Sequence, residues 1–254
     1  MTALRDARTV LQSFETLYEP ESGRWYMPPW LEQPFDPDRA EDWRCIYKNG
    51  WPAPVEREVG WLYAALVIML RPRAIIETGT NAGYSTLSMA AALAVLGGER
   101  SIYTIDISAA EHLFKGTDAA HLVTFLLGSS LEISLDQLPP EVDTLVLDSD
   151  HRYGTIAAEI NRFSPLLRVG GILITHDTMY YDGIALAIRQ LMQSPCFEVL
   201  TLPTPRQHKP QRCTGMTIAR KILPTTGDVI AFKEAYADIE VDAPGRQITD
   251  PPLV

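Results

Sequence analysis

From residue 74 onward, short apolar segments typical of strands alternate with longer segments that have helical spacing. The strand candidates are 74–77, 102–105, 123–127, 144–147, 172–175, 197–202 and 215–220. The helix candidates beside and between them include 55–70, 86–96, 155–167 and 183–192. Such alternation is typical of α/β domains, in which helices connect parallel strands and cover both faces of the sheet. The sequence therefore predicts an α/β fold with a doubly wound, mostly parallel, seven-stranded sheet.

The segment before this region, residues 1–54, has a different character. It begins with helical spacing over residues 4–17 and continues as an irregular arm that is broken by prolines. All five tryptophans lie within the first 61 residues. We expect them to line a substrate pocket or a subunit interface, or simply to pack the arm onto the domain.

The central domain is predicted to span residues 55–221, and residues 222–254 form a C-terminal extension. The prolines of residues 203–210 predict a long exposed loop between the last two strands. Helical spacing in the extension predicts one more helix, with Val229, Phe232, Tyr236 and Ile239 on one face. At 254 residues, 46% of them hydrophobic, the chain fits one large domain with extensions at both ends.

Charge and hydrophobicity narrow the classes of partner. A net charge of −10 disfavours nucleic acid, which is bound by clustered Lys and Arg, so a small-molecule substrate is expected. The longest apolar run, 61–70, is far shorter than the ~20 residues of a membrane span, and no secretion signal is evident. We therefore expect a cytoplasmic protein. Cys45, Cys196 and Cys213 are scattered, without a C-x-x-C pair, and are expected to be reduced packing residues.

The segment 74–90, A-I-I-E-T-G-T-N-A-G-Y-S-T-L-S-M-A, combines a strand, a glycine-containing turn and a helix start. Gly79 and Gly83 allow a tight turn and a close approach to a ligand, and Ser85 offers a hydroxyl at the helix start. The spacing fits neither the dinucleotide fingerprint nor the phosphate-binding P-loop. The carboxylate of Glu77 would repel a pyrophosphate but suits a cofactor with a cationic part. This favours S-adenosylmethionine, and the alternative is a turn whose glycines serve packing alone.

The residues E-T-G-T-N-A-G-Y-S at 77–85 resemble motif I of class I S-adenosylmethionine-dependent methyltransferases. The resemblance implies a Rossmann-like fold that ends in an antiparallel strand pair. Asp106 ends the second strand, where a carboxylate can accept hydrogen bonds from the two ribose hydroxyls of the cofactor. The alternative is that Asp106 is only a solvated aspartate at the end of a strand. The predicted cofactor-binding residues are Glu77, Gly79, Thr80, Asn81, Gly83, Ser85, Asp106, Gly128, Ser129, Ser130 and Asp148. Ser129 stands where many family members have aspartate, beside the adenine.

Two aspartates follow two further strands, Asp148 after 144–147 and Asp177 after 172–175. The carboxyl ends of adjacent parallel strands lie close together, and two acids there can share one divalent cation. The resemblance narrows here, over residues 55–221, to cation-dependent small-molecule O-methyltransferases of the catechol, caffeoyl-CoA and macrolide-sugar types and to relatives of cephalosporin hydroxylase.

His176 departs from that pattern, since the resembling enzymes have an acidic residue at this position. An imidazole ligand beside Asp148 and Asp177 favours Mn²⁺ or Fe²⁺ over Mg²⁺. Strand alternation points His176 and Asp177 to opposite faces unless the chain has already turned. The alternative for His176 is a hydrogen-bonded histidine behind the ligands.

His151 is the candidate general base, with Asp148 as the second catalytic residue. The pattern D-x-x-H at 148–151 resembles the macrolide-type enzymes, and a neutral imidazole can take a hydroxyl proton near neutral pH. The alternative is that His151 caps the following helix or binds Asp150. The other three histidines, His112, His121 and His208, are expected at the surface.

The sequence thus predicts a methyltransferase that acts on a hydroxyl group of a small molecule with the help of a divalent cation, as a homo-oligomer, most simply a dimer. Three alternatives remain: a metal-independent N- or C-methyltransferase, a metal-dependent hydroxylase that uses His176 with Asp148 and Asp177, and a non-catalytic binding module.

Overall fold

The computed structural model describes residues 18–19, 24–25, 55, 57–81, 83–114, 117, 119–204, 207–209, 212–225 and 227–240. The predicted helix at 4–17, Cys45 and the side chains of His112, His208 and Cys213 lie outside this description. Within the predicted irregular arm, β1 (Tyr18–Glu19) and β2 (Arg24–Trp25) form a short antiparallel pair. No helix in the described part of the chain is both long enough and apolar enough to cross a membrane.

The main sheet has seven strands in the order β5-β4-β3-β6-β7-β11-β8, which confirms the predicted α/β fold. β4 pairs with β5 and β6 pairs with β7 in parallel, whereas β11 is antiparallel to both β7 and β8. The strands are β3 (Ala74–Thr78), β4 (Ser101–Asp106), β5 (Val123–Leu127), β6 (Val142–Leu147), β7 (Leu167–His176), β8 (Phe197–Leu202) and β11 (Met216–Lys221). The α-helices are α3 (Arg57–Leu70), α4 (Tyr84–Leu96), α5 (Tyr153–Phe163) and α6 (Asp182–Leu191).

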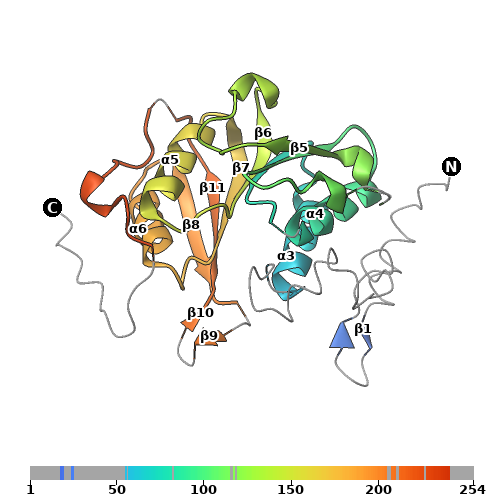
Figure 1. Ribbon diagram of the computed structural model, residues 1–254, viewed down its shortest axis with the longest axis horizontal. Coiled ribbons are helices and arrows are strands. Elements are labelled where there is room, and N and C mark those ends of the chain that lie inside the picture. The colour runs from blue at the N-terminus through green and yellow to red at the C-terminus, as the bar shows by residue number, and fades with distance from the viewer. Residues whose placement is uncertain are drawn as a thin grey trace. The chain divides into compact units, whose positions relative to one another are not determined.

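The chain separates into two compact units, one containing residues up to 75 and 80–128, the other 76–79 and 129 onward. In the first unit α3 and α4 pack side by side, and β4 and β5 form the strand pair (Figure 1). α4 is apolar on nearly all sides, with residues 88–93 buried, as expected for a helix enclosed by its neighbours. The short 3-10 helices Glu111–Leu113 and Ala120–Leu122 complete this unit.

In the second unit α5 and α6 pack against each other and accompany the strands β6, β7, β11 and β8 (Figure 1). Both helices are amphipathic, and they bury Ile156, Ile160 and Phe163 of α5 and Ile184 and Ile188 of α6. Apolar burial of this kind contributes roughly 25 cal/mol per Å². A further 3-10 helix, Leu135–Gln137, follows β5.

Two predicted boundaries are wrong because of a bulge in the sheet. β7 begins at Leu167 rather than at residue 172, so α5 ends at Phe163 and does not reach residue 167. The register between β6 and β7 shifts between Val142 and Thr144 of β6. Gly170, on the facing part of β7, has a φ of +82°. The bulge hides the strand alternation in the sequence. The predicted loop at 203–210 also contains β9 (Gln207–Lys209), which pairs with β10 (Arg212–Cys213).

The helix predicted through Val229 and Ile239 is also wrong. Residues 228–240, here called the C-terminal strap, are irregular except for a 3-10 turn at Glu234–Tyr236. Backbone groups of the strap are used in hydrogen bonds to α5 and α6, so they are not available for a helix of their own.

Candidate functional site

The turn after β3 is held by the carboxylate of Asp106, at the end of β4. Asp106 Oδ2 accepts a hydrogen bond from Asn81 N at 2.8 Å, and Oδ1 accepts one from Ser108 N at 2.8 Å. Asn81 has a φ of +45° and Gly83 a φ of +72°, and Gly83 N donates to Thr80 O. Thr80, Asn81 and Gly83 therefore lie in one structured turn, which is held by Asp106 and ends at the first residue of α4.

Other predicted cofactor residues lie at the start of α4 and in the turn after β5. Ser85 is the buried second residue of α4. Gly128 N donates to Asp106 O at 2.8 Å. The Ser129 hydroxyl accepts a weak hydrogen bond from Leu131 N at 3.3 Å, so it helps to form the turn after β5, and Ser130 is buried.

The backbone at the end of β3 directly contacts the backbone at the end of β6. Asp148 N donates to Thr78 O at 3.0 Å, and Glu77 is fully buried just before this point. Gly79 has a φ of +83°, and a Cβ there would overlap the carbonyl oxygen of Asp148 and lie 2.8 Å from Ser149 Cα. Gly79 is therefore required for the close packing of β3 against β6 as well as for the turn. At this residue, packing explains part of the need for glycine.

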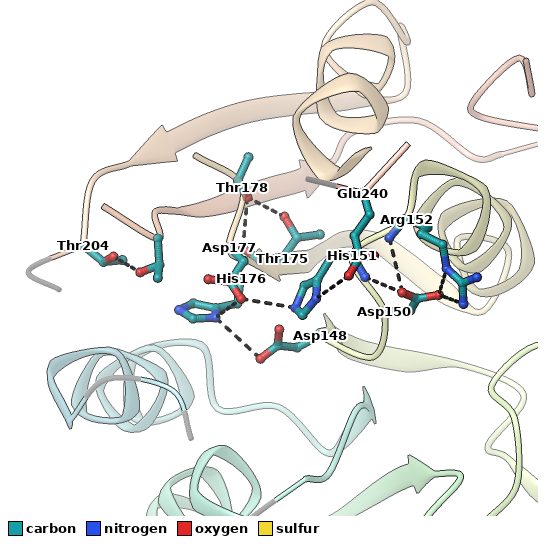
Figure 2. Close-up of polar contacts among 11 residues, drawn as sticks. Asp148, Asp150, His151, Arg152, Thr175, His176, Asp177, Thr178, Thr204 and Glu240 are labelled. Carbon is teal, nitrogen blue, oxygen red and sulfur yellow. Dashed lines mark hydrogen bonds and ion pairs between the residues drawn. The ribbon is translucent and has the colours of Figure 1, made fainter. Parts of the chain in front are cut away.

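Four acidic and imidazole side chains gather at the carboxyl ends of β6 and β7, as Figure 2 shows. His151 Nε2 lies 3.2 Å from Asp177 Oδ2. His176 Nδ1 lies 3.5 Å from Asp177 Oδ2 and 3.7 Å from Asp148 Oδ2. Asp177 has a φ of +57°, so the chain has already turned, and this is why two consecutive residues reach the same place. We call Asp148, His151, His176 and Asp177 the acid–imidazole cluster.

The cluster contains a set of atoms suited to a metal ion. Ligand atoms of Asp148, His151 and Asp177 all lie within 4.8 Å of one another. The sequence predicts His176 as the third ligand and His151 as a base. The geometry adds His151 to the candidate ligands, while His176 is the most buried member, with 5% of its side chain exposed.

Charge is balanced within the cluster. Burial raises the pKa of Asp148, and the neighbouring Asp177 adds to this effect. Burial also opposes ionisation of Asp177, but His176 and His151 outweigh it and hold its pKa below the ordinary range. Burial lowers the pKa of both imidazoles, yet the carboxylates reverse this and raise it, most strongly for His176. Positive charge beside the two carboxylates is therefore favoured here, as a protonated imidazole or as a cation.

The ring of His151 is fixed by further contacts. Tyr181 stacks on it, with ring centroids 3.8 Å apart and an interplanar angle of 5°, and Tyr180 meets Tyr181 edge-on. His151 N donates to Asp150 Oδ1, while Asp150 also accepts from Thr155 and Arg152 at the start of α5. Asp150, rather than the His151 ring, thus serves the start of this helix.

Three functional candidates escaped sequence reasoning. Tyr181 could have been noticed because it follows Asp177 closely, but its stacking partner is not readable from the sequence. Glu240 Oε1 lies 4.0 Å from His151 Nδ1 (Figure 2). No sequence pattern connects these two residues, because they are far apart along the chain. Glu159 is fully buried on α5 and accepts a hydrogen bond from Ser149 Oγ at 2.6 Å, so it contacts the residue after Asp148.

His121 is exposed, as predicted, and Cys196 is a free cysteine.

Comparison with known proteins adds a family context. Residues 76–178 match the family model described as a methyltransferase domain. The rhamnosyl O-methyltransferase of Mycobacterium leprae (strain TN) is 27% identical over 128 residues, and the match covers 46% of this chain and 54% of that protein. The chain therefore spans about half the length of this curated relative.

Solved structures share the fold. The O-methyltransferase TomG of Streptomyces achromogenes, involved in tomaymycin synthesis and solved with S-adenosylmethionine, matches with a TM-score of 0.60 and 18% identity over 83% of this chain and 99% of that chain. The methyltransferase PaMTH1 of Podospora anserina, solved with S-adenosylhomocysteine, matches with a TM-score of 0.60 and 19% identity over 85% of this chain and 94% of that chain. At this identity the likeness establishes the fold, a Rossmann-like methyltransferase fold.

Proposed function

Since residues 76–178 match the methyltransferase domain family, we propose that the protein transfers the methyl group of S-adenosylmethionine to a hydroxyl oxygen of a small molecule. The observation that carries the proposal is the acid–imidazole cluster at the carboxyl ends of β6 and β7. Ligands of open α/β sheets bind at this edge. The name of the curated relative, a rhamnosyl O-methyltransferase, supports oxygen as the methyl acceptor.

The donor chemistry of the turn after β3 fits this cofactor. Each oxygen of the Asp106 carboxylate accepts one backbone N–H, so lone pairs remain for the two hydroxyls of a ribose. The buried carboxylate of Glu77 suits the positive charge of the methionine part. When bound, the cofactor supplies an electrophilic methyl carbon on a sulfonium. We assign its binding to the residues predicted from the sequence, with Asp106 and Glu77 as the charged contacts.

The donor set of the cluster also fits a divalent cation. Asp148 and Asp177 would hold it with His151 or His176 as the third ligand, and the imidazole favours Mn²⁺ or Fe²⁺. When bound, the ion lowers the pKa of the acceptor hydroxyl and orients its oxygen.

A second candidate mechanism uses no metal, and the contacts within the cluster favour it. His151 Nε2 lies 3.2 Å from Asp177 Oδ2, so Asp177 can stabilise the imidazolium that forms when His151 takes a hydroxyl proton. His176 offsets part of the negative charge of the two aspartates, since its Nδ1 lies 3.7 Å from Asp148 Oδ2 and 3.5 Å from Asp177 Oδ2. In this mechanism His176, which contacts both Asp148 and Asp177, holds Asp177 in place. The acceptor can be an amine as well as a hydroxyl.

One experiment separates the two mechanisms. Formation of S-adenosylhomocysteine is measured with a panel of phenols and glycosides after treatment with a chelator, and again after addition of Mg²⁺, Mn²⁺ or Fe²⁺. A metal-dependent enzyme loses activity and recovers it with the ion, and Asp148→Asn and Asp177→Asn lose Mn²⁺ binding in calorimetry. Asp228→Asn, an exposed residue of the strap, is the matched control. Full turnover in the chelator rejects the metal and supports His151 as a base acting without it.

A further inference from the structure

The loop between β6 and α5 carries two members of the acid–imidazole cluster, Asp148 and His151 (Figure 2). Ser149, which follows Asp148 directly, is exposed, and an exposed side chain normally changes rotamer freely. The hydroxyl of Ser149 is nevertheless bound, because it donates to Glu159 Oε1 at 2.6 Å. The loop is therefore tied to the interior of the protein at the residue next to Asp148.

Glu159 is an acid on a helix face that is otherwise mostly apolar. The buried residues of α5 include Ile156, Ile160 and Phe163, and Glu159 is as fully buried as they are. A buried carboxyl costs free energy, and an apolar side chain of similar length would cost less at this position. Departures from the apolar pattern of a buried face are typical of functional positions, so Glu159 is a candidate for such a role.

The backbone at the end of β6 is held by a second, separate contact. Asp148 N donates to Thr78 O at 3.0 Å. An added Cβ at Gly79 would overlap Asp148 O and lie 2.8 Å from Ser149 Cα, so the end of β3 packs directly on these two residues. The backbone is thus bound to β3, and the Ser149 hydroxyl is bound to α5. Together the two contacts hold the Asp148 carboxylate where it lies, 3.7 Å from His176 Nδ1.

We propose that Glu159 is a positioning residue, which fixes the loop after β6 through the Ser149 hydroxyl and so holds the Asp148 carboxylate in the acid–imidazole cluster. Glu159 acts through Ser149 and takes no part in the chemistry itself. The inference rests on the proposed function, because the cluster is the place where the methyl acceptor is to be bound and deprotonated. It holds with or without a cation, since both mechanisms need Asp148 in place. A misplacement of about 1 Å in such a site can lower the rate by about 100-fold.

Two substitutions of Glu159 separate its hydrogen bond from its packing. Glu159→Met removes the acceptor of the Ser149 hydroxyl but keeps an unbranched side chain that suits a buried position, whereas Glu159→Gln keeps an acceptor oxygen. We expect Glu159→Met to lower kcat for formation of S-adenosylhomocysteine by about 10- to 100-fold, without a fall in melting temperature. Glu159→Gln should restore most of kcat. The control is Ser194→Ala, since this serine after the end of α6 accepts a weak hydrogen bond from Cys196 N at 3.3 Å.

Ser149→Ala tests whether Glu159 acts through the hydroxyl. This variant removes the same hydrogen bond from its other end, so it should lower kcat to a similar extent. If the two residues act as one unit, Glu159→Met should cause little further loss in the Ser149→Ala background. Residues that act independently would give losses that multiply.

Amide hydrogen exchange gives a readout that does not depend on activity. The N–H of Asp148 is hydrogen-bonded to Thr78 O, and in Glu159→Met its exchange should accelerate by roughly tenfold, because the loop is held less firmly. The N–H of Val146, a fully buried residue inside β6, should exchange as it does in the wild type.

The outcomes that reject the inference are specific. If Glu159→Met keeps the wild-type kcat and the wild-type exchange of Asp148, or if the losses of kcat multiply, Glu159 does not act through Ser149. Equal acceleration of exchange at Asp148 and Val146, with a lower melting temperature, shows a structural role alone. A wild type that neither binds S-adenosylhomocysteine nor transfers a methyl group defeats the proposed function instead, and the exchange comparison then still decides the role of Glu159.

Discussion

Glu159 is a buried carboxyl whose charge has a cost for the folded state. Burial raises its pKa from 4.5 to about 7, although the hydroxyl of Ser149, which donates to Oε1, stabilises the charged form. Its Oε2 has no hydrogen-bond partner among the described residues. A carboxyl with a raised pKa in the folded state contributes stability at low pH, and that stability is lost as the pH rises through the folded-state pKa.

Glu159→Gln should therefore change the pH dependence of stability. Between about pH 4.5 and 7 the free energy of unfolding of the wild type should fall by up to roughly 3 kcal/mol through this group, and the variant should lack this fall. The variant should then be the more stable protein at about pH 8. Urea unfolding at acidic and basic pH measures the difference, with the exposed Glu141→Gln as control. An identical pH slope in the wild type and Glu159→Gln would contradict the prediction.

The start of α6 packs closely against the strap. Gly183 is its second residue, and a Cβ there would overlap the carbonyl oxygens of Ile239 and His151 and lie 2.5 Å from Tyr153 N. These are backbone atoms of two segments, the strap and the residues that lead into α5, and Tyr153 N and Ile239 O form a hydrogen bond that holds the strap. A glycine is needed here for the close approach of chains.

Gly183→Ala should consequently destabilise the protein by more than about 2 kcal/mol, which is large for a single methyl group. Gly227→Ala is the matched control, because nothing lies within 4 Å of a Cβ at that position. Thermal or urea unfolding of both variants measures the effect. Equal stability of the two variants would show that the strap can be displaced from α6 at little cost.

At the scale of the whole molecule, binding of the proposed cofactor should stabilise the folded state. A ligand that binds only the folded chain raises the free energy of unfolding by about 2.7 kcal/mol at a concentration of 100 times its Kd. S-adenosylhomocysteine should therefore raise the melting temperature of the wild type. Asp106→Ala should bind it at least roughly tenfold more weakly, because charge-assisted hydrogen bonds to the ribose are lost. The exposed Glu111→Ala is the control, and an unchanged affinity in Asp106→Ala removes Asp106 from the cofactor site.

Much of the architecture was predictable because it is local in the sequence. Alternating apolar segments predicted the seven strands of the sheet, since the side-chain period of a strand or helix depends on neighbouring residues. The positions of Asp106, Asp148 and Asp177 were predictable for a related reason. Parallel strands end at the same edge of a sheet, so the residues after them are brought to one side by topology alone.

The tertiary structure decided the features that depend on contacts between distant segments. The φ of +57° at Asp177 turned His176 and Asp177 toward the same point, against simple strand alternation. The strap does not form the predicted helix, because its backbone groups form hydrogen bonds with α5 and α6 instead. Its path brought Glu240 to His151. The sequence by itself determined which elements form and which acids end the strands, because these follow from local periodicity and chain order. Only the packed fold determined which side chains face each nitrogen of His151, because that depends on the path of a segment far along the chain.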